Sequence, residues 1–333
     1  MTSVVLSSLG LIGSEDLAIS AGQLPGRVSI VHGATAEVIC SDDDVEVALT
    51  CSFSGSLDLL PVAGDWVGVT GTQITQVLPR SSALCRPDPN GRDIQVLASN
   101  VNFVLIVVPI DRGLNVRMLE RFAIMGFESG ATPIIVLTKI DATNDLDAML
   151  RETELTVPNV RVFTTSSKSG EGINQLRTLL VSGVTAVMLG ASGAGKTSLL
   201  NALEGTEELT RTVGRSGEGR HATTTRKLYR LSSGGVLLDI PGIRLLDLIV
   251  GAEGVEQSFA DIVALSEDCR FSDCKHAGDL DCAVEAAVRS GDLAQRRLES
   301  WHLIQEEMAL QSKRRSPEEM MRQRRRSRPR PKQ

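Results

Sequence analysis

A glycine-rich segment just past the middle of the chain has the residue types that hold phosphate. Residues 190–198 read GASGAGKTS, between the apolar run VTAVML and the helical pattern SLLNALEG. Glycines let consecutive backbone N–H groups converge on phosphate oxygens, and a helix that begins there adds its positive dipole end. We therefore predict that this loop binds the phosphates of a nucleotide through Gly190, Ala191, Ser192, Gly193, Ala194, Gly195, Lys196, Thr197 and Ser198.

Further polar residues would complete the phosphate and magnesium chemistry. Lys196 is expected to bridge the β- and γ-phosphates as a catalytic residue, and the Thr197 hydroxyl is expected to bind Mg²⁺. Asp239, in the segment LLDIPG about forty residues further on, ends a second apolar run. An aspartate at that distance from a phosphate loop holds Mg²⁺ through water, and the amide of Gly242 is expected to sense the γ-phosphate.

The segment TKID at 138–141 is the candidate base-reading element. The Asp141 carboxylate can accept hydrogen bonds from N1–H and the exocyclic amine of guanine, a donor pair that adenine lacks. The Lys139 stem is expected to lie along the purine ring. Downstream, Ser166, Ser167 and Lys168 are expected in the loop that covers guanine O6 with a backbone amide. These residues predict GTP or GDP as the ligand.

Cysteines and a histidine near the C-terminal end have the spacing of a metal site. The pattern C-x4-C-x-H-x5-C is formed by Cys269, Cys274, His276 and Cys282. Three thiolates and one imidazole form a closed tetrahedral set, typical of structural rather than catalytic Zn²⁺. The alternatives are a chance grouping or a disulfide, and a cytoplasmic setting argues against the disulfide. We predict one structural zinc ion, and we expect the cysteines at 40, 51 and 85 to be small core residues.

The composition is that of an ordinary soluble globular protein. Of the 333 residues, 42% are hydrophobic and 23% are charged. The longest apolar run, VNFVLIVVPI at 101–110, is too short to cross a bilayer, and no basic region precedes the apolar N-terminus as in a secretory signal. We therefore expect a cytoplasmic monomer with no membrane partner.

The motifs fall on a predicted α/β domain that follows a small β-rich region. Residues 1–95 contain short β-like runs broken by Gly, Pro and Asp, which favours a small barrel of the OB type. The barrel has few aromatic residues for base stacking, so nucleic-acid binding and a purely structural role both stay open for it. Residues 96–250 alternate strands with helical stretches, the pattern of a doubly wound α/β sheet.

The C-terminal part divides into a helical region and a basic tail. Residues 251–312 contain the zinc cluster and a long helical run, which predicts a zinc-binding α-helical domain. Residues 313–333 hold ten Lys or Arg and two Glu, although the whole chain carries a net charge of −6. Such a tail suggests a flexible arm for the phosphate backbone of RNA, and the alternative is a solvated, disordered end.

The order of the motifs along the chain is unusual. TKID and SSK precede GASGAGKTS, which is followed by HATTT and DIPG, the order of a circularly permuted phosphate-loop GTPase. The chain resembles the ribosome small-subunit-dependent GTPase family (RsgA/YjeQ) over nearly its whole length. The resemblance includes this motif order, the barrel and the zinc spacing. It also includes three further segments: GDWV at 64–67, LPRSSALCRP at 78–87 and ASNVNFVLIVV at 98–108.

The resemblance implies a Mg²⁺-dependent GTP hydrolase that acts late in small (30S) ribosomal subunit assembly, binds its rRNA and is stimulated by that subunit. The alternative is a nucleotide-gated RNA- or ribosome-binding module whose hydrolysis is incidental. An ATPase or small-molecule kinase would need an adenine site or an acceptor pocket, and the sequence indicates neither. Because the permutation places the switch loops directly before the zinc region, γ-phosphate binding is expected to reposition that region.

The chain departs from the family pattern at the base site and at the magnesium site. Thr138 replaces the usual asparagine of N-K-x-D; we still count it among the nucleotide-binding residues, but guanine preference then rests mainly on Asp141. The histidine–threonine run reads HATTT at 221–225, and we take Thr223 as the third magnesium ligand, with Thr224 as the alternative.

The glutamine that orients the attacking water in Ras-like enzymes has no counterpart here. It follows the glycine of the D-x-x-G motif in those enzymes, but Ile243 follows Gly242 in this chain. We expect His221, in the glycine-rich segment GRSGEGRH, to act on the water once RNA contacts order that segment. The alternative is that His221 contacts RNA or caps the loop.

Overall fold

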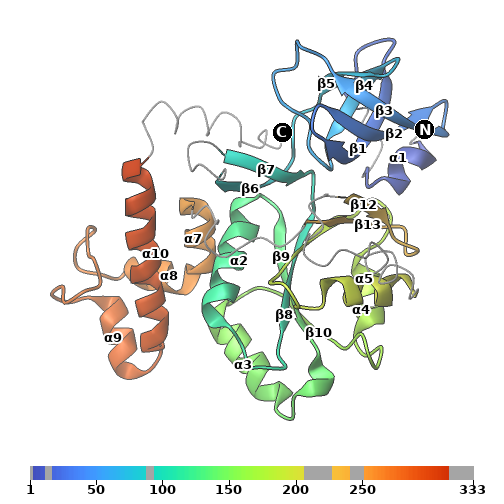
Figure 1. Cartoon of the computed structure of the whole chain (residues 1–333). Helices are drawn as coiled ribbons and strands as arrows, with labels where there is room; N and C mark the ends of the chain where they lie inside the picture. Colours follow the sequence, from blue (N-terminus) through green and yellow to red (C-terminus); the bar gives the residue numbers. More distant parts are fainter. Residues whose placement is uncertain (1–2, 12–16, 88–93, 206–226, 241–250, 315–333) are drawn as a thin grey trace.

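The computed structural model describes residues 3–11, 17–87, 94–205, 227–240 and 251–314, without the side chains of 312–314. Figure 1 shows three regions: an N-terminal barrel, a central sheet with helices on both faces, and a group of helices from the C-terminal part. The expected residues His221, Thr223 and Gly242 lie outside the described residues, as does the tail from 315 onward. Among the described residues, no helix is both long and apolar enough to cross a membrane.

The N-terminal region is a closed five-stranded barrel, which confirms the OB-type prediction. Its strands are β1 (Leu24–His32), β2 (Thr35–Asp42), β3 (Val45–Phe53), β4 (Trp66–Thr70) and β5 (Gln73–Val77). They pair in the order β1-β2-β3-β5-β4, and β4 closes the barrel on β1. Cys40 and Cys51 are fully buried in the barrel core, as expected of small core cysteines. The short helix α1 (Val4–Ser8) contacts β2.

The central region is the predicted doubly wound α/β domain. Its strands are β8 (Phe103–Pro109), β9 (Thr132–Thr138), β10 (Val162–Thr165), β11 (Thr185–Leu189), β12 (Lys227–Arg230) and β13 (Val236–Asp239). They lie in the order β10-β9-β8-β11-β13-β12, parallel except for β12. The strand that leads into TKID, β9, precedes β11, the strand before the phosphate loop, so the domain is circularly permuted.

Alternating side chains of the central strands build two cores. On one face, residues such as Val104 and Ile106 pack under α2 (Val116–Glu128) and α3 (Leu146–Thr156). On the other face, residues such as Leu105 pack under α4 (Ile173–Leu179) and α5 (Lys196–Glu204). Because a slip in register would move buried side chains to the wrong face, strands that are buried on both faces have one fixed register. The positions of the strand ends relative to one another are therefore fixed as well.

The barrel is attached to the sheet by a hairpin, a strand pair and one buried arginine. The hairpin is formed by β6 (Ala83–Pro87) and β7 (Ile94–Ser99), and the expected domain boundary after residue 95 falls within β7. β1 also pairs with β12. The fully buried Arg27 donates to Thr185 Oγ1 at 2.7 Å and to the Asn100 carbonyl at 2.9 Å. The barrel therefore rests on the strand that leads to the phosphate loop.

The C-terminal helices pack against α2 and α3 (Figure 1). They are α7 (Ala252–Ser258), α8 (Ala260–Ser266), α9 (Ala283–Ser290) and α10 (Gln295–Arg314). Arg297 is their main polar anchor: it is 3% exposed, donates to both carboxylate oxygens of Asp261, and reaches the Thr156 carbonyl of α3 at 2.7 Å. Its guanidinium also lies 4.0 Å from the centroid of the Phe259 ring.

Candidate nucleotide and metal sites

The predicted nucleotide-binding segments meet at one edge of the sheet. Parallel pairing places Thr138 opposite both Pro109 and Thr165, and places Asp239 opposite Met188, one residue before the last residue of β11. The phosphate loop follows β11 directly. Since the carboxyl ends of parallel strands in open α/β sheets form the ligand-binding edge, this is the expected place for a nucleotide.

The phosphate loop has the backbone geometry that a close approach to phosphate needs. A Cβ at Gly190 would lie 2.6 Å from the Val107 carbonyl oxygen, so only glycine fits there. Gly193 and Gly195 have φ values of +77° and +95°, which favour glycine, and α5 begins directly after Gly195. The N-terminus of α5 thus points its free N–H groups into the loop.

Lys196 lies across this loop. Its Nζ donates to the carbonyl oxygens of Gly190 and Ala191 at 2.8 and 3.0 Å. Burial lowers the pKa of Lys196, and the nearby Asp239 carboxylate opposes that shift. In turn, burial raises the pKa of Asp239, and Lys196 lowers it. Each of the two charged groups therefore favours the ionised form of the other.

The remaining loop residues differ in exposure. Ala194 is buried, whereas Ser192, Gly193, Thr197 and Ser198 are exposed. The Thr197 hydroxyl lies in the first turn of α5, and Asp239 ends β13 beside β11. Hydroxyl and carboxylate oxygens are the hard ligands that Mg²⁺ prefers, so these two residues fit a magnesium ion.

Thr138 is engaged by the phosphate loop. Its hydroxyl donates to the Ala194 carbonyl at 2.7 Å, and its side chain is 3% exposed. This hydrogen bond joins the base-reading segment to the phosphate loop. Thr138 stands where the family pattern has asparagine, and the structure gives its hydroxyl a partner within the protein.

Two further residues of the base-reading segment, Lys139 and Asp141, are also held by side chains. Lys139 has a left-handed backbone (φ 62°), and its Nζ donates to Asp111 Oδ2 at 2.9 Å. Asp141 Oδ1 accepts a hydrogen bond from the Ser166 hydroxyl at 2.6 Å, and this bond is the main cause of the lowered pKa of Asp141. Lys168 Nζ lies 4.0 Å from Asp141 Oδ2.

The loop after β10 is shaped by its own hydrogen bonds. The Ser166 hydroxyl accepts hydrogen bonds from the backbone N–H groups of Lys168 and Ser169. Ser167, between Ser166 and Lys168, is half-buried. A Cβ at Gly172 would lie 1.8 Å from the Thr164 carbonyl oxygen, which accounts for the glycine at this position. Two of the three residues expected near guanine O6, Ser166 and Lys168, therefore lie beside Asp141.

Asp111 was missed by the sequence reasoning. It follows β8 by two residues, next to the end of β9, and a single carboxylate there belongs to no motif. The only signal available was its place directly after a strongly apolar run.

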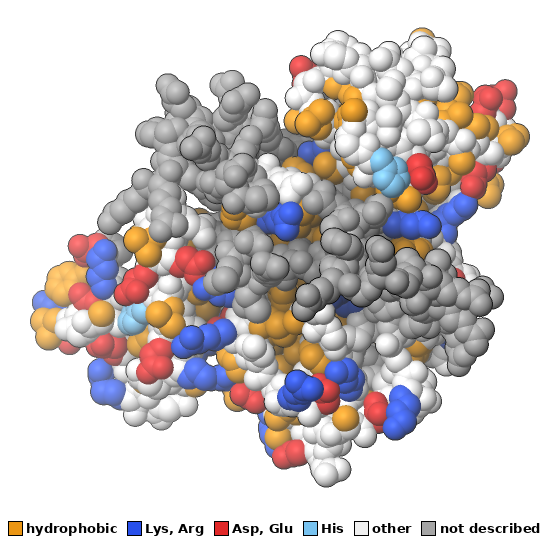
Figure 2. Space-filling view, viewed as in Figure 1, with side chains coloured by type: hydrophobic (Ala, Val, Ile, Leu, Met, Phe, Trp, Pro, Cys, Tyr) orange, Lys and Arg blue, Asp and Glu red, His pale blue; other side chains and the backbone are white. Residues whose placement is uncertain are grey.

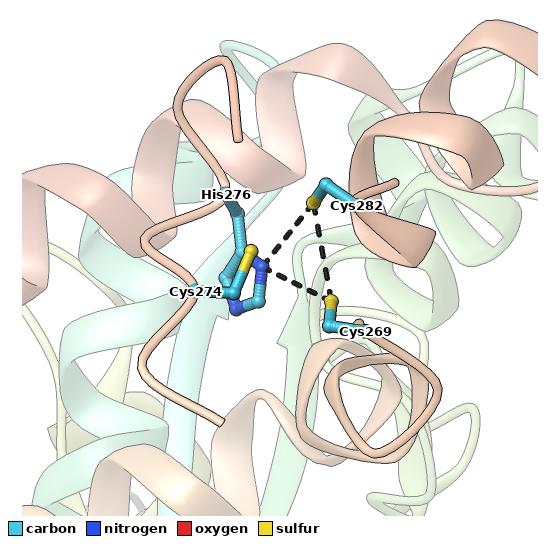
Figure 3. A group of neighbouring side chains, drawn as sticks. All are labelled: Cys269, Cys274, His276 and Cys282. Atoms are coloured by element: carbon cyan, nitrogen blue, oxygen red, sulfur yellow. Dashed lines mark hydrogen bonds between the residues drawn. The ribbon is translucent and has the colours of Figure 1, made fainter. Parts of the chain in front are cut away.

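The four predicted metal ligands converge in the C-terminal helical region. Cys269 follows α8, Cys282 caps the N-terminus of α9, and the loop between supplies Cys274 and His276 (Figure 3). Their ligand atoms all lie within 4.8 Å of one another. The Cys269 and Cys282 sulfurs are 4.0 Å apart, and His276 Nδ1 is 3.6 and 3.4 Å from them.

These separations fit a tetrahedral metal. With Zn–S near 2.3 Å and Zn–N near 2.0 Å, tetrahedral ligands lie about 3.8 Å (S to S) and about 3.5 Å (S to N) apart. Burial opposes ionisation of Cys269, but the backbone N–H groups of Val284 and Ala283 lower the pKa of its thiol overall. Burial and the neighbouring thiols raise the pKa of Cys274 to about 12. A bound cation would stabilise the thiolate forms of these closely spaced cysteines, so the group can hold a metal ion.

A comparison with protein families identifies the chain. A family model described as RsgA GTPase matches residues 77–249, more than half of the sequence. The chain belongs to the RsgA GTPase family. A relative named small ribosomal subunit biogenesis GTPase RsgA, from Streptomyces coelicolor, is 41% identical over 298 residues, which cover 86% of this chain and 81% of the relative.

Solved structures share the architecture of this chain. The crystal structure of YjeQ from Thermotoga maritima superposes with a TM-score of 0.65 at 26% identity and covers 86% of this chain and 99% of that chain. A structure of YloQ, described as a circularly permuted GTPase, has the same fold, with a TM-score of 0.61 at 23% identity over 89% of this chain and 97% of that one. This RsgA-family chain is thus a GTP hydrolase with the permuted fold.

Proposed function

We propose that this chain hydrolyses GTP to GDP and phosphate as a late assembly factor of the small ribosomal subunit, which stimulates the reaction. The observation that carries the proposal is the similarity to relatives named for small-subunit biogenesis over more than four-fifths of both chains. We further propose that the protein works as a cytoplasmic monomer that contacts the rRNA of the subunit.

The proposed nucleotide site uses the edge of the sheet described above. Asp141 reads the guanine edge, the Lys139 stem covers the ring, and the loop 166–168 approaches O6. Residues 190–198 hold the phosphates, and Lys196 neutralises the charge that develops during phosphoryl transfer. These assignments are supported by the meeting of the segments at one edge of the sheet. They are also supported by the charges of Lys196 and Asp239, each of which favours the ionised form of the other.

The magnesium ion would be held by Thr197, Asp239 and Thr223, and Gly242 would sense the γ-phosphate. Once bound, Mg²⁺ neutralises phosphate charge and supports departure of GDP. His221 would act on the attacking water once the small subunit is bound. Thr223, Gly242 and His221 are assigned from the sequence alone, because they lie outside the described residues.

The cysteine–histidine group is proposed to bind one structural Zn²⁺. The donor set is closed, so it leaves no position for a substrate. Its ligands come from the segment directly after α8, the N-cap of α9 and the loop between them, so zinc would fix these helices relative to each other. The helical region would then present a defined surface to the subunit.

Co-sedimentation with purified small ribosomal subunits tests the proposal. The chain is incubated with subunits and a non-hydrolysable GTP analogue, GDP or no nucleotide, and free large subunits serve as the control. We expect retention on small subunits to be strongest with the GTP analogue, because the γ-phosphate orders the switch segments. Equal retention on both subunits, or retention independent of nucleotide, would contradict the proposal.

A further inference from the structure

An ion pair outside the known motifs fixes the lysine of the base-reading segment. Asp111 follows β8, and Lys139 follows the neighbouring parallel strand β9. The register places Pro109 opposite Thr138, and the Ile110 N–H donates to the Thr138 carbonyl at 3.2 Å. The segments that follow β8 and β9 therefore leave the sheet side by side. Asp111 on the first segment and Lys139 on the second are close enough to form an ion pair.

The contact is short and partly shielded from water. Lys139 Nζ lies 2.9 Å from Asp111 Oδ2, with 38% of the lysine and 25% of the aspartate side chain exposed. The hydrogen bond from Lys139 is the main cause that lowers the pKa of the Asp111 carboxyl below its ordinary value. The aspartate is therefore ionised near neutral pH and holds the ammonium end of the lysine.

We propose that Asp111 is a positioning residue for guanine-nucleotide binding, which acts by holding Lys139 with its stem along the purine ring. A free lysine side chain loses rotamer entropy when it is fixed on binding. The ion pair removes part of that cost in advance, because the ammonium end is fixed while the methylene stem stays available. This inference rests on the nucleotide site of the proposed function.

The same arrangement distinguishes Asp111 from Asp141. Asp141 is held by Ser166 and would bond the guanine edge, so its effect depends on the exocyclic amine. Asp111 acts through the stem of Lys139, which packs on the ring face, so its effect is the same with or without that amine. The two carboxylates therefore control different properties: Asp111 sets the affinity for the purine ring, and Asp141 sets the choice of base.

Direct binding of nucleotides by the full-length protein, without ribosomes, tests the inference. Asp111→Asn is compared with wild type and with Asp147→Asn, which removes an exposed carboxylate in the first turn of α3. We expect Asp111→Asn to weaken GDP and IDP binding by the same factor, about three- to tenfold, and Asp147→Asn to have no effect. Asp111→Glu should restore part of the loss.

A double-mutant cycle and steady-state kinetics separate positioning from general damage. In a Lys139→Met background, Asp111→Asn should have no further effect on GDP binding, because the partner of the carboxylate is gone. In GTP turnover, Asp111→Asn should raise KM and leave kcat unchanged.

Unchanged or tighter GDP binding by Asp111→Asn would overturn the inference. So would an equal loss of affinity in the Lys139→Met background, since the effect would then not pass through the lysine. A wild-type protein that binds no GDP would instead refute the proposed guanine site itself.

Discussion

Replacement of Thr138 by valine would test whether the base-reading segment holds the phosphate loop. Valine keeps the shape of the side chain and removes the hydroxyl that donates to the Ala194 carbonyl at 2.7 Å. Both residues are buried, so water cannot readily replace the lost donor. An unsatisfied buried carbonyl costs about 1–3 kcal/mol.

This cost should be measurable in two ways. Chemical denaturation should show a free energy of unfolding lower by about 1–3 kcal/mol, since the carbonyl regains water only on unfolding. Calorimetric titration should show GDP binding weakened about tenfold, which corresponds to about 1.4 kcal/mol, because the loop must be ordered during binding. The ratio of GDP to IDP affinity should stay unchanged, since this hydroxyl bonds the loop and not the base.

Thr138→Ser is the matched control, because it keeps the hydroxyl and should bind GDP within about twofold of wild type. The reasoning is refuted if Thr138→Val retains both wild-type stability and wild-type GDP affinity. A changed GDP-to-IDP ratio would show instead that the residue contacts the base.

Four other predictions concern separate parts of the molecule. Asp141→Asn should shift preference from GDP toward XDP, because the donor and acceptor pattern is exchanged; competition binding measures this, and equal ADP and GDP affinity in wild type would refute the guanine assignment. Cys269→Ser should release metal, detectable by elemental analysis, and unfold the C-terminal helices while nucleotide binding persists; purified wild-type protein without zinc would contradict this. Arg297→Met should lower the free energy of unfolding by about 3–5 kcal/mol, because the buried Glu120 loses its cation. Since burial raises the pKa of Glu120, this loss should grow as the pH rises through that raised pKa, and a pH-independent loss would count against it. His221→Ala should abolish stimulated turnover and spare GTP and subunit binding; full stimulated turnover in this variant would exclude the catalytic role.

Much of the candidate site could be predicted because its chemistry is encoded locally. The phosphate loop needs glycines and a lysine at fixed spacing, and the zinc cluster needs four ligands within fourteen residues. Parallel strands read as apolar runs, and their carboxyl ends meet at one edge, so the motifs come together once the strand order is correct.

The contacts that hold these motifs could not be predicted, because each joins residues far apart in the sequence. The bond from Thr138 to Ala194 and the ion pair of Asp111 with Lys139 both depend on strand register. The burial of Arg27 could not be predicted either, because a single arginine in a strand is usually expected to be exposed. In the structure its N–H groups donate to backbone carbonyls and to the Thr185 hydroxyl in the interior. Such partners are visible only after folding.

The position of the C-terminal helices also needed the structure. The chain order suggested that the switch segments lead directly into the zinc region. The helices pack on α2 and α3, through Arg297 and an ion pair between Arg121 and Glu307. Asp111 and Asn115, the N-cap of α2, lie on the same connection from β8. Helix α2 thus lies between the base-reading edge and the zinc-binding helices.

GTP turnover measured with and without purified small ribosomal subunits tests the central claim most directly. Saturating Mg²⁺–GTP and a fixed low protein concentration are used, with large subunits as the control. We expect slow hydrolysis by the protein alone and a rise of at least about tenfold with small subunits only, because the bound subunit positions groups that act on the transferred phosphate. The same rate in all three conditions would contradict the claim that this protein is a GTPase controlled by the small subunit.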